Sequence, residues 1–150
     1  MFDELKIYIK SLDDNAITKH NIYSVLETDI LKVENKIEIP YELKLFYLEV
    51  GYGFFHKNIG ESFRLFGPHN FQQINLKEDF YEFDPDLDIY DQIYNGDKLL
   101  FFEVFGGNYL AIDKEDFEGK NKIFHYDKKI ANSLEEFLIE LDKKPNYFDD

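Results

Sequence analysis

Residues 39–55 read IPYELKLFYLEVGYGFF, and they combine a helix start, an apolar helix body and an end marked by glycine. Pro40 suits the first turn of a helix because its fixed φ fits there and its missing N–H is not needed. Gly51 is expected to end the helix in the left-handed conformation. The stretch therefore predicts a buried central helix that leads through a turn at Gly53 into a strand. Four apolar side chains at i, i+3, i+4 and i+7 would form one face of that helix: Leu43, Phe46, Tyr47 and Val50.

The length and composition of the chain are those of one domain spanning residues 1–150. Of the 150 residues, 44% are hydrophobic, and a domain of this size buries roughly 68–70% of the surface that its unfolded chain exposes. The chain has no cysteine, which excludes disulfides, thiolate metal sites and a cysteine nucleophile. No stretch approaches the roughly 20 apolar residues that span a membrane, and residues 1–10 do not resemble a signal peptide. We therefore expect a soluble, cytoplasmic protein.

The charge of the chain is strongly acidic. It has 31 Asp and Glu residues against 17 Lys and Arg, which gives a formal net charge of -14. Such a surface repels nucleic acid and anionic lipid, and it attracts basic partners. We therefore expect neither nucleic acid nor a membrane as a partner. The alternative is that the acidic charge only maintains solubility.

The other apolar patterns predict helices and strands without a regular alternation. Short helices are expected near residues 2–12, from Thr28 or Asp29 to Ile37, and loosely over residues 71–80, whereas residues 17–26 are ambiguous. Strands are expected over residues 54–56, 63–66, 98–104, 109–113 and 122–126. Ser133 and Glu136 form a capping box that starts a last helix, which ends before Pro145. This order indicates an α+β fold, with a mainly antiparallel sheet of about four to six strands flanked by helices.

Residues 78–97 differ from the rest of the chain in composition. This stretch holds eight acidic side chains and no Lys or Arg. Within it, Leu87, Tyr90 and Tyr94 keep helical spacing. The stretch is therefore predicted to be a loop followed by a short helix with a solvated acidic face.

The search for catalytic or metal-binding patterns yields no complete motif. Asp84, Asp86 and Asp88 have the first three ligand spacings of a calcium loop, but Ile89 stands where glycine is required and Asn95 where a bidentate Glu belongs. No two histidines have metal-ligand spacing on one helix, and no serine lies in a nucleophile elbow. We therefore expect no catalytic residues, no metal and no cofactor, although paired carboxylates leave a small hydrolase as a minor alternative.

Three ordered motifs resemble the SUKH superfamily, which includes fungal cell-wall assembly regulators and many bacterial immunity proteins. They are residues 39–47 with 51–55, residues 96–102 leading to 107–113, and residues 123–127 with 133–138. The resemblance runs from about residue 34 to residue 141. It implies a non-enzymatic α+β module, which in bacteria binds and neutralises a cognate toxin, often a nuclease. It also implies that some of the motif residues determine the fold: Pro40, Gly51, Gly53, Gly107 and Asn108.

Two functional hypotheses follow, and both are without catalysis. The first is an immunity protein that blocks a basic toxin, with Asp84, Asp86, Asp88 and Asp91 supplying charge and Tyr90 and Tyr94 serving as aromatic anchors. The second is a regulatory scaffold in cell-wall or signalling control. A basic toxin encoded beside the gene favours the first hypothesis, and a partner that survives high salt favours the second.

Overall fold

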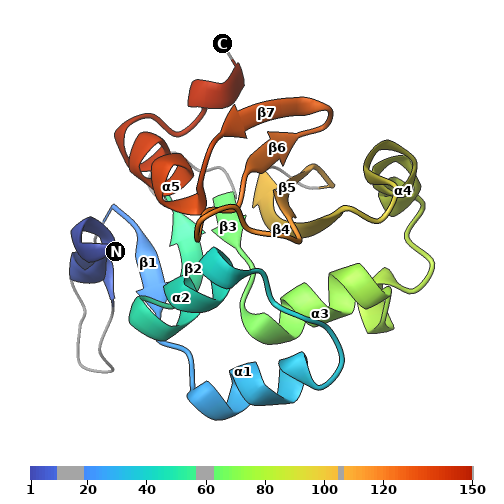
Figure 1. Cartoon of the computed structure of the whole chain (residues 1–150), viewed down its shortest axis with the longest axis horizontal. Helices are drawn as coiled ribbons and strands as arrows, with labels where there is room; N and C mark the ends of the chain where they lie inside the picture. The colour runs from blue at the N-terminus through green and yellow to red at the C-terminus, as the bar shows by residue number, and fades with distance from the viewer. Residues whose placement is uncertain (10–18, 57–62, 105–106, 150) are drawn as a thin grey trace.

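The computed structural model describes residues 1–9, 19–56, 63–104 and 107–149. Seven strands form one sheet, and each strand pairs antiparallel with the next strand in sequence (Figure 1). This confirms the α+β class with an antiparallel sheet, with more strands than predicted. The strands are β1 (Asn21–Tyr23), β2 (Tyr52–Phe55), β3 (Phe63–Leu65), β4 (Lys98–Val104), β5 (Tyr109–Asp113), β6 (Ile123–His125) and β7 (Lys128–Ala131).

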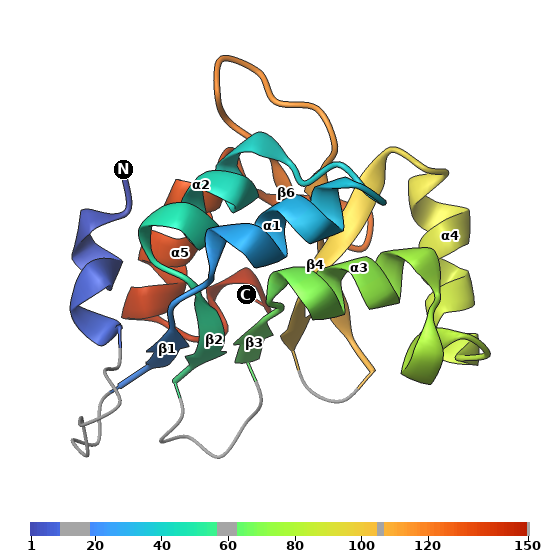
Figure 2. The same ribbon diagram turned by 90° about the horizontal axis from the view of Figure 1, so that it is seen from below.

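Five α-helices flank this sheet. Helix α1 contacts α2 and α3, α3 contacts β4, and α5 contacts α2 and β7, as Figure 2 allows the reader to follow. The helices are α1 (Glu27–Glu34), α2 (Tyr41–Glu49), α3 (Pro68–Leu76), α4 (Asp88–Tyr94) and α5 (Leu134–Lys143). Short 3-10 turns complete the described chain: η1 (Asp3–Tyr8), η3 (Asp79–Tyr81), η4 (Pro85–Leu87) and η5 (Tyr147–Asp149).

Two glycines of the stretch 39–55 let β1 approach β2. A Cβ at Gly51 would lie 1.9 Å from the carbonyl oxygen of Tyr23, and one at Gly53 would lie 2.1 Å from that of Asn21. Gly51 also has a φ of 141°, which lies outside the left-handed helical region that we predicted for it. The backbone there is almost extended in a region that only glycine adopts easily, so the chain leaves α2 and enters β2 within two residues.

A buried carboxylate joins α2 to α5. Glu42 is almost fully buried, and it accepts hydrogen bonds from the backbone N–H groups of Asn121 at 2.5 Å, Leu134 at 2.9 Å and Glu135 at 3.2 Å. The Asn121 side chain in turn accepts from the backbone N–H of Glu42 at 3.0 Å. Because Leu134 and Glu135 form the first turn of α5, the Glu42 carboxylate satisfies donors that a helix start leaves free.

The capping box predicted at Ser133 is confirmed in part. The Ser133 hydroxyl accepts from the backbone N–H of Glu136 at 3.0 Å. The Glu136 carboxylate reaches one residue further back than the motif requires, and it accepts from the backbone N–H of Asn132 at 2.7 Å. The start of α5 is therefore held by Ser133, Glu136 and Glu42 together.

Candidate interaction surface

The acidic stretch 78–97 connects α3 to β4 through η3, η4 and α4. It lies at the opposite end of the longest axis from η1 in both views (Figures 1 and 2). The prediction of a loop and a short helix is confirmed. The helix predicted loosely over residues 71–80 lies earlier than expected. It begins at Pro68 and ends at Leu76, where Lys77 takes the left-handed conformation with a φ of 55°.

Hydrogen bonds hold the start of this stretch against α3. The Gln72 side-chain amide donates to Glu78 at 2.9 Å, and that of Gln73 donates to Asp79 at 2.9 Å. Tyr81 then inserts its ring into the core, with 6% of the residue exposed. The backbone on either side of Tyr81 is thereby fixed to the body of the protein.

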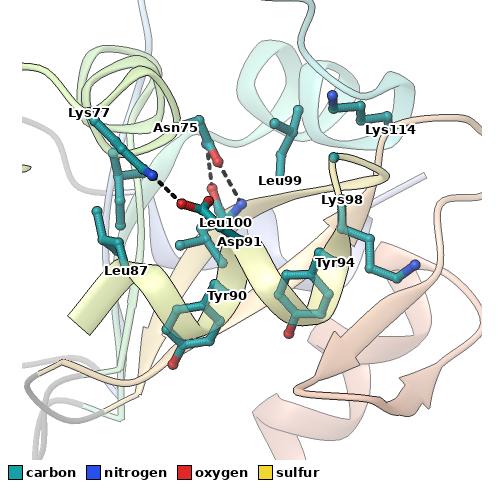
Figure 3. Close-up of a pocket in the computed structure, with 12 residues that line it drawn as sticks. Asn75, Lys77, Leu87, Tyr90, Asp91, Tyr94, Lys98, Leu99, Leu100 and Lys114 are labelled. Atoms are coloured by element: carbon teal, nitrogen blue, oxygen red, sulfur yellow. Dashed lines mark hydrogen bonds and ion pairs between the residues drawn. The ribbon is translucent and has the colours of Figure 1, made fainter. Parts of the chain in front are cut away.

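The predicted aspartates have different surroundings. Asp84 is half-buried and caps η4, because its side chain accepts from the backbone N–H of Asp86 at 2.9 Å. Asp86 and Asp88 are exposed, and they make no ion pair with the residues that the structure describes. Asp91 forms an ion pair with Lys77 across a pocket of about 150 Å³ between α3, α4 and β4 (Figure 3). Of the four aspartates, Asp86 and Asp88 therefore offer the most available charge.

Tyr90 and Tyr94, the predicted aromatic anchors, lie inside the protein. Both are buried, and in Figure 3 their rings point away from Lys77 and Asp91. The Tyr90 hydroxyl accepts from the backbone N–H of Tyr109 at 2.9 Å, and its ring stacks on Tyr126 with centroids 5.7 Å apart. Burial raises the pKa of both tyrosines. The two rings hold α4 on the sheet, so the predicted anchors are not exposed in this structure.

Two phenylalanines that the sequence analysis did not select occupy the exposed side of this stretch. Phe80 is 83% exposed and Phe83 is 88% exposed, the highest values among the large apolar residues of the described chain. The ring of Phe80 contacts that of the buried Tyr81, with centroids 5.2 Å apart. The sequence feature that could have indicated the exposure of Phe83 is Pro85, because the residue before a proline avoids the helical conformation. The proline takes Phe83 out of the helical spacing that buries Leu87.

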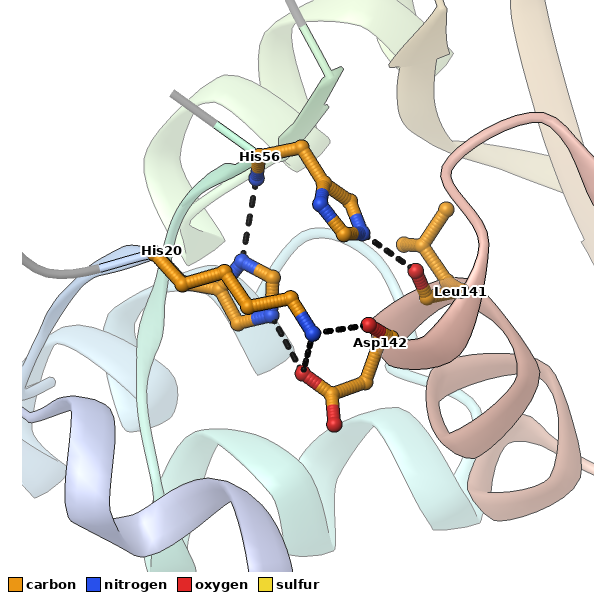
Figure 4. Close-up of polar contacts among 5 residues, drawn as sticks. His20, His56, Leu141 and Asp142 are labelled. Atoms are coloured by element: carbon orange, nitrogen blue, oxygen red, sulfur yellow. Dashed lines mark hydrogen bonds and ion pairs between the residues drawn. The ribbon is translucent and has the colours of Figure 1, made fainter. Parts of the chain in front are cut away.

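A buried histidine pair elsewhere has the residue types of a catalytic site but not its arrangement (Figure 4). His20 Nδ1 accepts from the backbone N–H of His56 at 3.0 Å, and His20 Nε2 lies 2.7 Å from a carboxylate oxygen of Asp142. His56 Nε2 donates to the backbone carbonyl of Leu141. Burial lowers the pKa of His20 to about 4. Both nitrogens of the fully buried His20 ring are engaged. The pair therefore connects the residue before β1, the residue after β2 and the end of α5.

Within the described residues, no group of three His, Asp or Glu side chains is placed to hold a metal ion. The search for membrane spans over the same residues finds no helix with the length and apolar character to cross a bilayer.

Comparison with known proteins places the chain in a family. The model of the SMI1 / KNR4 family (SUKH-1) matches residues 24–140. The chain belongs to the SUKH-1 family. The match begins just before α1 and ends within α5, so it contains α2, Gly51, Gly53 and the acidic stretch. The resemblance inferred from the three motifs is confirmed.

A similar curated protein carries a functional name. The chain is 37% identical over 143 residues to a Bacillus subtilis (strain 168) protein named Immunity protein YxxD, and the match covers 94% of this chain and 92% of the relative. The comparison with solved structures finds no match.

Proposed function

We propose that this protein is an immunity protein, which binds a cognate protein toxin and neutralises it without catalysis. The observation that carries the proposal is the relative named as an immunity protein, which is similar over nearly the whole length of both chains. The family match over residues 24–140 supports the same direction.

The charge of the protein supports a basic toxin as the partner. The net charge is -14, and an acidic protein associates quickly with a basic one because long-range attraction steers their encounter. A nuclease fits this description best, since an enzyme that binds phosphate does so with basic side chains. An acidic inhibitor can cover such a site and compete with the nucleic acid for it.

Growth of a bacterial host tests the proposal. The first candidate toxin is the polypeptide encoded beside this gene. If its expression does not arrest growth, the candidate is another polypeptide of the same cell that does so when expressed alone. We expect co-expression of the wild-type protein to restore growth, and the two purified proteins to form a stoichiometric complex that weakens between about 50 mM and about 500 mM salt. Continued arrest despite equal expression would contradict the proposal. A complex with a non-toxic partner that persists at high salt would favour the regulatory scaffold hypothesis.

A further inference from the structure

Phe80 and Phe83 are the most exposed large apolar residues of the described chain. Each ring is more than four-fifths exposed, although a buried aromatic side chain is one of the largest contributors to a core. Neighbouring Tyr81 and Leu87 are buried, so the same stretch has access to the core and directs only some of its apolar side chains into it. Exposed aromatic rings of this kind are typical of protein contact surfaces.

The backbone that carries the two rings is held in place before any partner binds. Tyr81, which lies between Phe80 and Phe83 in the sequence, has its ring buried in the core. The contacts of Gln72 and Gln73 fix the residues before Phe80, and the Asp84 cap fixes the turn after Phe83. A partner would therefore meet rings on an ordered backbone, which lowers the conformational entropy lost on binding.

The negative charge of this stretch favours a partner with a basic surface. Glu82, Asp86 and Asp88 are exposed in the same stretch of chain and make no ion pair with a described residue, and the whole stretch 78–97 contains no Lys or Arg. A second copy of this chain would bring like charges together, and an anionic membrane would be repelled. A basic protein surface with an apolar depression satisfies both the rings and the carboxylates.

We propose that Phe80 and Phe83 are the anchor residues of the toxin interface, and that they insert into an apolar depression within the basic face of the toxin. Glu82, Asp86 and Asp88 form the acidic rim around the anchors, steering the encounter and fixing its orientation. This inference rests on the proposed immunity function and names the surface that carries it out.

The double variant Phe80→Ser/Phe83→Ser tests the assignment in the growth assay and in calorimetric binding to the same toxin. Phe117→Ser is the matched control, because Phe117 is 73% exposed and flanked by Asp116 and Glu118, but lies in the loop between β5 and β6 (orange, Figure 2). We expect the double variant to lose protection and to bind about 100-fold or more weakly. Phe117→Ser should protect fully and bind within about threefold of the wild type.

A thermal unfolding scan of each variant separates binding from folding. Both variants should keep the wild-type midpoint within about 2 °C, since the replaced rings are exposed. Full protection by the folded double variant would overturn the anchor assignment and leave the immunity function intact. Loss of protection in both variants would also overturn it, because the effect would then not be specific to this surface. Failure of the wild-type protein to protect would overturn the proposed function and the inference with it.

Discussion

The stretch 39–55 and the segment 79–88 both contain several aromatic residues together with carboxylates, but they place key members of each type in very different surroundings. In the first, Phe46 and Phe55 are fully buried and the Glu42 carboxylate accepts three backbone hydrogen bonds. In the second, Phe80 and Phe83 are exposed, and neighbouring acids have no ion pair among the described residues. The same residue types stabilise the fold in one region and are available to a partner in the other. Changes in the first region should therefore affect stability, and changes in the second should affect binding.

Substitution of Gly53, within β2, is expected to cause a large loss of stability. The added Cβ of Gly53→Ala would meet the Asn21 carbonyl oxygen at 2.1 Å, so β1 would have to separate from β2. We expect a loss of more than about 4 kcal/mol in the free energy of unfolding, measured by urea denaturation. Gly96→Ala is the control, because Gly96 has a φ of 85° but no atom within 4 Å of the added Cβ. Its cost should be about 1–2 kcal/mol, and an equal loss in both variants would contradict the close approach of β1.

The next largest effect is expected at Glu42. Glu42→Ala leaves two buried and one partly buried backbone donor without their acceptor, and we expect a loss of about 3–5 kcal/mol in the free energy of unfolding. Glu42→Gln keeps one carbonyl oxygen and should lose roughly half as much. Urea denaturation of both variants, beside the exposed control Glu38→Ala, measures the difference. A Glu42→Ala variant as stable as the control would show that the buried carboxylate does not hold α2 to α5.

Acidification should weaken the fold through His20. Burial lowers the pKa of His20 to about 4 in the folded protein, whereas an unfolded His titrates near 6.5. Between these values the unfolded chain binds the proton and the folded protein does not. The contribution of His20 to the free energy of unfolding should therefore fall by about 3 kcal/mol as the pH drops from 6.5 to 4.

The variant His20→Asn isolates this contribution. The other groups around the ring, Asp142, Lys19, His56 and Tyr8, remain in place. We expect urea denaturation at a series of pH values to show a shallower slope for the variant between pH 6.5 and 4. Parallel slopes for the variant and the wild type would contradict the buried neutral state of His20.

The smallest effect on stability is expected from neutralising the acidic rim. Glu82→Gln/Asp86→Asn/Asp88→Asn should change the free energy of unfolding by about 0.5 kcal/mol or less, because these side chains are exposed. The same variant should associate with the toxin about tenfold more slowly at low salt. Stopped-flow association at several salt concentrations measures this, and an unchanged rate with an unchanged salt dependence would place the electrostatic contact elsewhere.

The sequence predicted the regions whose structure depends on local pattern. The apolar spacing of α2, the hairpin of β4 and β5 and the cap at Ser133 were all found where expected. Strand β7 was missed because Lys128–Ala131 has only two apolar side chains and pairs with β6 through a register shift. Strand β1 was ambiguous because its three residues depend on the close approach that Gly51 and Gly53 permit.

The candidate site could be predicted only in part. The charge of residues 78–97 was evident from composition, but exposure is decided by three-dimensional packing. Tyr90 and Tyr94 share helical spacing with Leu87, and that spacing buries them against the sheet. Phe83 would share it as well, but Pro85 separates it from α4. Which aromatic residues remain exposed therefore follows from where α3 ends and where η4 begins.

Amide hydrogen exchange of the protein with and without its toxin tests the division between the two regions most directly. We expect toxin to slow exchange in the segment 79–88 by local protection, whereas the buried amides of residues 39–55 should slow no more than the added global stability of the complex requires. Protection that falls on another surface, with segment 79–88 unchanged, would contradict this expectation.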